Sequence, residues 1–185
     1  MKKFFIALSA LVFSTLACSI FIGGPAYPDP PIPVSTADVQ SLQDQASTAI
    51  ANGLQTGTVS LQITEAQLTS YLAYKIDSQA NPLITDPQVQ LRAGQMQIFG
   101  KAQQGMFNAN ISITMTVSVD DQGKPKIAIT QADFGPLPTP QGLNDAVSAA
   151  VEEAFTGSLG PVATGFRLES ITIADGVMTV VGRTQ

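Results

Sequence analysis

The strictest pattern in this chain is an alternation of apolar and polar residues from Phe107 to Val119. Every odd position in this range is apolar, and every even position is Asn, Ser or Thr. Because successive side chains of a strand point to opposite faces, the pattern predicts a strand with one buried face and one wet face. At ~3.3 Å per residue this strand would be roughly 40 Å long, about twice the usual length. The fold must therefore provide a long apolar surface to cover one side of the strand.

The segments around this strand predict further antiparallel strands. Asp120-Asp121-Gln122-Gly123 is a turn that leads into a strand over 126–132, so the pair forms a long hairpin. Shorter alternating or apolar runs predict strands at 59–63, 89–91, 96–99, 166–173 and 177–181. Turn-forming residues, Ala93-Gly94 and Ala174-Asp175-Gly176, separate two of these pairs.

Three segments have the spacing of apolar residues that is typical of helices: 36–54, 64–77 and 141–156. Ser35 or Thr36 can cap the first helix, and Thr64-Glu65-Ala66-Gln67 is a capping box at the start of the second. Antiparallel hairpins with one apolar face need helices to cover that face, and the helices at 64–77 and 141–156 are the best candidates. The predicted fold class is α+β, with an antiparallel β-sheet of hairpins packed on α-helices.

Residues 1–17 have the features of an export signal. Two lysines precede an uncharged apolar run over 4–17, and Cys18, the single cysteine of the chain, follows directly. Ser14-Thr15-Leu16-Ala17-Cys18 resembles a bacterial lipobox, with Thr15 where the usual pattern has Leu. We therefore expect 1–17 to be a signal peptide and Cys18 to be lipidated, which would hold the chain at the outer face of a bacterial membrane.

Two other interpretations of the N-terminus stay open. Cleavage after Ala17 or Ala26 by an ordinary signal peptidase would release a secreted protein. Without cleavage, the uncharged stretch over 4–22 is long enough to span a bilayer as a helix, at ~1.5 Å per residue. Either a lipid anchor or an uncut helix would place the remaining chain at the outer face of a membrane.

Residues 18–35 are expected to form a proline-rich tether between the anchor and the domain. Five prolines lie between positions 25 and 33, and such a run favours an extended polyproline conformation at ~3.1 Å per residue. The tether would hold the domain up to about 50 Å from the membrane. The alternative is a proline-rich loop that packs on the domain. Residues 36–185 are expected to form a single α+β domain.

Charge and residue types exclude several functions. The net charge is −5 and no basic patch stands out, so neither nucleic acid nor tight electrostatic docking on anionic lipid is expected. The chain has no histidine, which removes the commonest general base and the commonest zinc ligand. Asp120-Asp121 fits a hairpin turn better than a calcium loop. We expect no enzyme activity, no catalytic residues, no metal site and no cofactor.

The order of elements resembles the YpmS-like and LmeA-like bacterial envelope proteins. The resemblance covers residues 58–183, and two motifs carry it: the helix start at Thr64-Glu65-Ala66-Gln67-Leu68, and Gly135-Pro136-Leu137-Pro138-Thr139-Pro140 before the last helix. It implies a domain related to tubular lipid-binding folds, with a long curved antiparallel sheet wrapped around a helix. It also implies an apolar groove, with lipid or another apolar ligand as cargo, and no catalytic residues.

A length comparison supports such a groove. A strand of roughly 40 Å is longer than the helix at 64–77, which covers only about 21 Å. Apolar side chains of the long hairpin and its neighbour are therefore candidates for a ligand site, at one end Met96, Phe107 and Ala109, and toward the other Met115 and Val117. We expect an anchored, extracytoplasmic, non-catalytic protein that binds lipid. The alternative is an envelope scaffold or interaction module with a packed core and no ligand.

Overall fold

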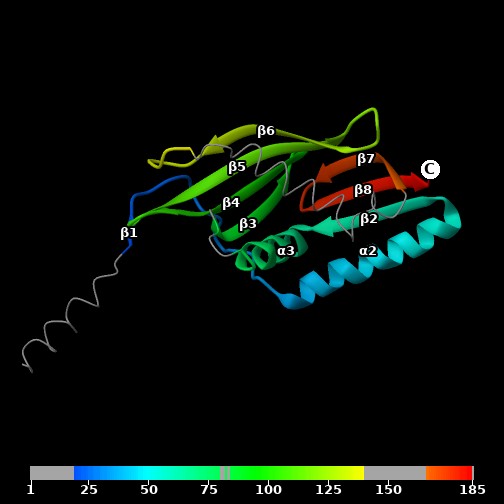
Figure 1. Ribbon diagram of the computed structural model, residues 1–185, viewed down its shortest axis with the longest axis horizontal. Coiled ribbons are helices and arrows are strands. Elements are labelled where there is room, and N and C mark those ends of the chain that lie inside the picture. Colours follow the sequence, from blue (N-terminus) through cyan, green and yellow to red (C-terminus); the bar gives the residue numbers. More distant parts are fainter. Residues whose placement is uncertain (1–18, 80–81, 83, 140–165, 185) are drawn as a thin grey trace, which may run out of the picture.

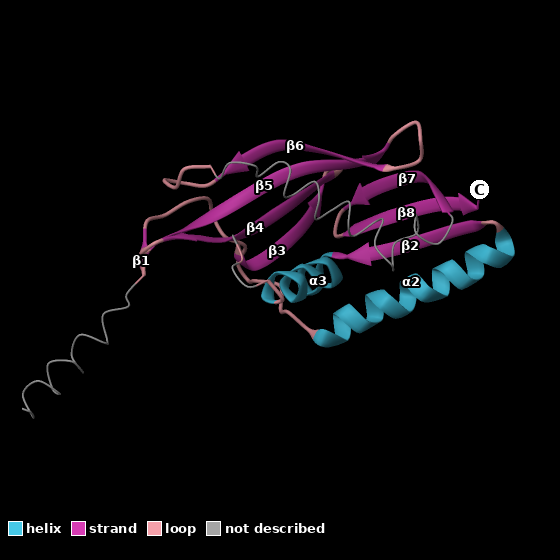
Figure 2. Cartoon of the chain, in the orientation of Figure 1, coloured by secondary structure: helices cyan, strands magenta, loops and turns pink. Residues whose placement is uncertain are grey.

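A computed structural model describes residues 19–79, 82, 84–139 and 166–184 (Figure 1). The expected signal peptide, Cys18 and the helix expected at 141–156 lie outside the described residues. The described elements are β1 (Ile20–Phe21), α2 (Thr36–Thr56), β2 (Thr58–Thr64), α3 (Glu65–Asp77), β3 (Thr85–Arg92), β4 (Gln95–Gln104), β5 (Phe107–Val119), β6 (Pro125–Asp133), β7 (Phe166–Ala174) and β8 (Val177–Thr184). The result is a mixed α+β fold in which strands dominate, as Figure 2 shows.

The long strand β5 is the centre of a five-stranded sheet. β4 pairs with one edge of β5 and β3 pairs with β4, both antiparallel. The other edge is shared, because β1 pairs in parallel with the first two residues of β5 and β6 pairs antiparallel from Ser112 to Val119. The predicted hairpin of β5 and β6 is confirmed. β4 extends beyond its predicted bounds because its ladder with β5 continues to Phe107, and β3 extends with it because β3 pairs with β4 as far as Lys101.

Burial along β5 follows the predicted alternation. The odd positions from Ala109 to Val117 are buried, whereas most even positions stay half-buried. Met96 lies opposite Met115 and Ile98 lies opposite Ile113, so the inner face continues across β4. Two residues depart from the pattern: Phe107, at the start of the strand, is exposed, and Ser112, at an even position, is buried.

A second sheet has the order β2-β8-β7, and both sheets share one hydrophobic core. Leu168 and Met178 of the small sheet belong to the same buried cluster as Ile113 and Met115 of the large one. Main-chain hydrogen bonds join the sheets where their turns meet: Gly176 donates to the Leu91 carbonyl over 2.9 Å, and Leu168 donates to the Gly123 carbonyl over 3.2 Å. The two sheets together form a curled half-barrel (Figure 2).

Helix α2 packs against β2 and α3. Ser35 caps its first turn, and Gly57, in the left-handed region at φ 79°, ends it. Gly53 is needed for the packing, since an added Cβ would lie 2.9 Å from the Phe166 ring. Helix α2 therefore lies against the small sheet, and the end of the helix around Gly53 packs on Phe166 of β7.

Helix α3 begins with the predicted capping box at Thr64 and Gln67. The apolar spacing that predicted this helix comes from Leu68, Tyr71, Leu72 and Ile76, and of these only Ile76 is buried. The other buried residues of the helix are largely polar: Gln67, Thr69 and Ser70, with Ala73. The reason is that hydrogen bonds tie the polar side to its neighbours. The Thr69 hydroxyl accepts from Val89 N at 3.0 Å, and a Glu65 carboxylate oxygen accepts from Leu91 N at 2.6 Å.

Residues 19–35 lie on the domain, so the packed-loop alternative describes them and the extended tether does not. After β1, the segment runs over the outer face of the large sheet, where Phe99, Gln88 and Ser112 are buried. Gln88 binds Ile32 as a neighbouring strand would: its Oε1 accepts from Ile32 N at 2.6 Å, and its Nε2 donates to Ile32 O at 3.0 Å. These hydrogen bonds between the Gln88 side chain and the Ile32 main chain hold the proline-rich segment on β3.

Two further contacts hold this segment. The Tyr27 hydroxyl donates to the Asp86 carbonyl over 2.5 Å, and burial, with the Asp86 carboxylate nearby, raises the pKa of Tyr27 above its usual value. Gly24, expected to belong to a linker, has φ 118° and lies so close to the Asn110 carbonyl that an added Cβ would collide with it. Gly24 is therefore a packing position.

The two faces of β5 should respond differently to charge. Ile113→Asp places an unpaired carboxylate in the core and should lower the free energy of unfolding by about 4 kcal/mol or more. Thr114→Asp lies on the opposite face between Gln97 and Gln131, and should change it by about 0.5 kcal/mol or less. Urea unfolding followed by circular dichroism measures both. Similar losses for the two variants would contradict the assignment of the buried face.

Gln88→Ala should free the N-terminal segment from the sheet. The substitution leaves the Ile32 amide and carbonyl without their partners, which should cost about 2 kcal/mol. Hydrogen–deuterium exchange of residues 22–34 should show lost protection. Gln90→Ala is the matched control, since Gln90 lies on the same strand and face and forms no side-chain hydrogen bond within the described residues. Unchanged exchange in the Gln88 variant would contradict the proposed role of this contact.

Candidate functional site

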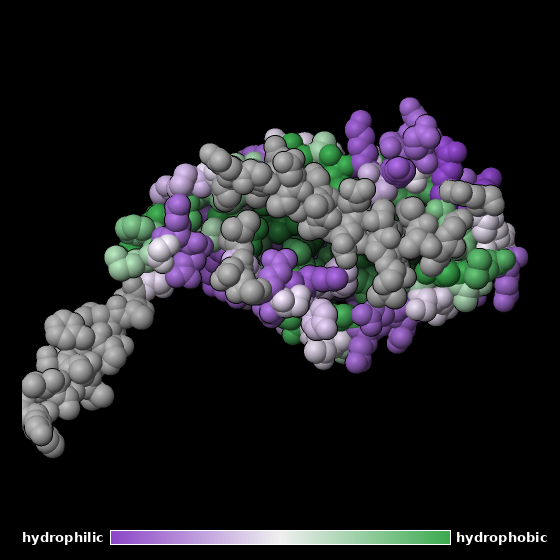
Figure 3. All heavy atoms as spheres, viewed as in Figure 1, coloured by the Kyte–Doolittle hydropathy of each residue, from purple (hydrophilic) through white to green (hydrophobic). Residues whose placement is uncertain are grey.

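Half-buried aliphatic side chains surround the hydrophobic core on several sides. They come from α3, β4, β6 and β7, and each packs against the buried cluster. We call this set the apolar rim: Leu68, Leu72, Ile98, Ile129, Ile171 and Ile173. Figure 3 shows apolar atoms gathered in a hollow in the middle of the molecule, between the large sheet and α3. The rim carries no charged side chain, which suits an apolar ligand.

The lengths of the elements leave part of the large sheet beyond the reach of α3. β5 has 13 residues and spans about 43 Å at ~3.3 Å each. α3 also has 13 residues but spans only about 20 Å at ~1.5 Å each. The large sheet consequently extends beyond α3 toward β1 (Figure 1). Because α3 also turns a polar side to β3, Leu68 and Leu72 remain available at the edge of the core.

The five groove residues expected from the sequence do not line one space. Ala109, Met115, Val117 and Met96 are buried in the core, where Met96 and Met115 face each other across β4 and β5. Phe107 is 45% exposed at the start of β5. The alternation alone does not tell a packed position from a rim position.

The alternation of apolar and polar residues in β6 and β7 marks several of these half-buried positions in the sequence. Ile127 and Ile129 alternate with polar residues in β6, as Ile171 and Ile173 do in β7. β6 pairs with β5 on one side, and no other strand of the described residues pairs with it. Strands at the edge of the core keep their apolar residues partly exposed, and edge position is a property of the topology.

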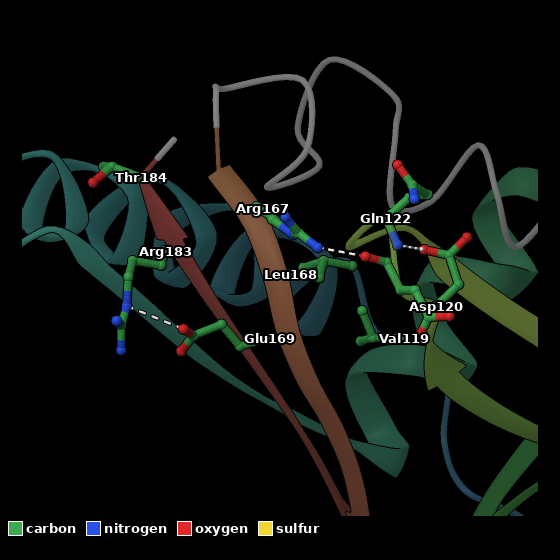
Figure 4. A pocket seen from close by; sticks show the side chains of 9 residues that line it. Val119, Asp120, Gln122, Arg167, Leu168, Glu169, Arg183 and Thr184 are labelled. Carbon is green, nitrogen blue, oxygen red and sulfur yellow. Dashed lines mark hydrogen bonds and ion pairs between the residues drawn. The ribbon is translucent and has the colours of Figure 1, made fainter.

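A polar pocket of about 930 Å³ lies at the junction of the two sheets (Figure 4). The turn after β5 forms one side of it, and the outer ends of β7 and β8 form the other. Its lining residues are Val119, Asp120, Asp121, Gln122, Arg167, Leu168, Glu169, Arg183 and Thr184. The pocket is separate from the apolar rim.

The charged groups of this pocket bind each other. Arg167 and Arg183 are direct partners in the β7–β8 pairing, and two like charges at such positions repel. Glu169 offsets this by forming an ion pair with Arg183 at 3.0 Å, and the Arg167 guanidinium donates to the Asp121 carbonyl. Gly123 makes room for Arg167, because an added Cβ would collide with its side chain. Arg167 therefore links β7 to the turn after β5, whereas the Arg183–Glu169 pair lies within the small sheet.

The described residues bring together no group of three or more Asp, Glu, Cys or His side chains that could hold a metal ion. Within the same ranges, no helix combines the length and the apolar character needed to cross a membrane. The expected signal peptide and Cys18 lie outside the described residues, so the expected anchor and localisation stay predictions.

Comparisons with known proteins leave the family open. No protein-family model matches the chain, and no curated protein sequence matches it. One solved structure, titled "Crystal structure of lipopolysaccharide binding protein", aligns with 70% of this chain and 50% of its own chain, at 10% sequence identity and a TM-score of 0.29. The chain thus spans about half the length of that protein. A likeness of this size carries no argument, and the resemblance to YpmS-like and LmeA-like proteins stays a prediction.

Proposed function

We propose that this protein is anchored at the outer face of a bacterial membrane and binds a lipid or another apolar ligand on its apolar rim, without catalysing a reaction. The observation that carries the proposal is the apolar rim itself: six half-buried aliphatic side chains from four elements lie around one core. Large apolar surfaces that are not fully packed are typical of binding sites in monomeric proteins.

The chemistry of the rim suits an acyl chain. Leucine and isoleucine present only CH groups, so the rim offers contact without orienting polar groups. Each CH₂ of a ligand that leaves water contributes about 0.8 kcal/mol. Burial of about eight CH₂ groups gives about 6 kcal/mol before the entropy cost of binding. Contact with the rim therefore favours ligands with long aliphatic chains.

The proposed anchor is supported by the order of features at the N-terminus. Two lysines, an uncharged apolar run and a single cysteine at position 18 follow one another as in a lipoprotein signal. Export would place the domain outside the cytoplasm. The first described residue, Ser19, follows Cys18 directly and binds Asn108 of β5, whose amide donates to its hydroxyl over 3.1 Å. The domain would therefore sit close to its point of attachment.

One observation favours the rival function, an envelope scaffold without ligand. Met96, Ala109, Met115 and Val117, four of the five positions first expected to bind, are buried in the core. The two functions differ in one measurable property. A carrier should co-purify with lipid, detected by native mass spectrometry, and a scaffold should not.

Leu72→Gln should weaken lipid binding more than stability. The variant replaces a half-buried rim residue and should reduce affinity for a fluorescent polyene fatty acid about tenfold, which corresponds to ~1.4 kcal/mol of lost contact. Leu54→Gln, at an exposed leucine of α2, is the control and should bind as the wild type does. Thermal unfolding verifies that both variants stay folded. If the wild type takes up no fatty acid, or if both variants bind equally, the scaffold is the better description.

Cys18→Ser should release the protein from membranes. Lipidation needs the thiol, so the variant should lose metabolic labelling by fatty acid and move to the soluble fraction. Membrane fractionation and labelling of whole cells measure the two effects. Membrane retention of an unlabelled wild-type chain would instead indicate an uncut transmembrane helix.

A further inference from the structure

Exposed apolar residues are concentrated at one end of the molecule. Seven large apolar side chains are exposed among the described residues, and four of them lie together: Ile20, Phe21, Met106 and Phe107, between 45% and 64% exposed. We call these four residues the tip patch. Scattered single apolar residues are normal on a surface, but a cluster indicates a binding surface.

Backbone pairing brings the two segments of the tip patch together at one end of the molecule. Ile20 lies in register with Phe107, and Ile20 N donates to the Met106 carbonyl over 2.7 Å. The turn between β4 and β5 and the start of the described chain therefore meet at this end. Figure 3 shows apolar atoms at the same end of the molecule, where the described chain begins.

The tip patch lies in a region without charge. No charged residue occurs between Lys3 and Asp29, nor between Lys101 and Asp120. Both segments that form the tip are thus uncharged over their full length. Apolar side chains that enter the acyl region of a bilayer gain contact with lipid, whereas a charged side chain there is costly. The composition of the tip fits contact with lipid better than contact with a charged protein surface.

We propose that the tip patch inserts into the surface of the membrane to which the chain is anchored, and that this contact directs the tip of the β4–β5 hairpin toward the bilayer. The inference rests on the proposed anchor, because the chain leaves the domain at the tip itself: only Ser19 separates Cys18 from Ile20. An anchor at this place holds the patch at high local concentration near the lipid. The far end of α2 then points away from the membrane (Figure 1).

The chain contains no tryptophan, so one substitution creates a unique fluorescent reporter. Phe107→Trp and, independently, Met106→Trp place it in the tip patch. Leu54→Trp places it at another exposed apolar position, in the last turns of α2 at the opposite end. The full-length protein, processed by the host, is reconstituted into phosphatidylcholine vesicles with or without brominated acyl chains. Flotation of the vesicles reports the anchor, and quenching reports the position of each residue.

Both tip variants should show a blue-shifted emission and about twofold quenching by the brominated lipid, while Leu54→Trp shows neither. Protein that floats with the vesicles but is not quenched at 106 or 107 overturns the tip contact and leaves the anchor intact. Equal quenching at 54 and 107 overturns the directed orientation, and so the proposal. Protein that does not float and is not quenched overturns both the anchor and the tip contact.

Discussion

Five side chains of β5, at the odd positions from Ala109 to Val117, are removed from water, and the rest of the fold is arranged around this face. A buried aliphatic side chain contributes about 1.5–3 kcal/mol, so a face of this length is a dominant source of stability. β4 and β6 extend the face sideways, and β7 and β8 close over it. Where more room is needed, a glycine provides it: Ile84 packs against Gly100, the partner of Ile111.

The outer face of the same sheet follows a different rule, because its residues are polar and still partly buried. Gln88 and Ser112 are buried on the face over which the segment before α2 runs. The Gln88 side chain accepts from the Ile32 amide and donates to the Ile32 carbonyl. A buried amide is stable only when its donors and acceptors are paired. The N-terminal segment therefore satisfies the buried polar side chain of Gln88, and Gln88 in turn pairs the main chain of the segment. Through these hydrogen bonds the proline-rich stretch becomes part of the domain.

The two proposed lipid contacts arise from the same mismatch of lengths. A strand of 13 residues reaches well past a helix of 13 residues, so the large sheet has apolar positions that α3 does not cover. In the middle of the molecule Ile98 and Ile129 of the large sheet belong to the apolar rim, together with half-buried residues of α3 and β7. At the free end of the hairpin, beyond the inner core, Met106 and Phe107 meet the start of the chain. Interior binding and membrane contact would thus be properties of one elongated sheet.

The sequence by itself determined β5, its hairpin with β6, the β7–β8 hairpin and the capping box of α3, because each depends on residues that are close together in the chain. Only the tertiary structure decided which apolar residues are packed and which form the rim, since that depends on which strands lie at the edge. The packing of the N-terminal segment depends in the same way on distant partners: Ile32 and Gln88 are 56 residues apart, and Tyr27 and Asp86 are 59 apart. Alternation assigns a residue to a face, but only the neighbours of that face decide whether the residue is covered.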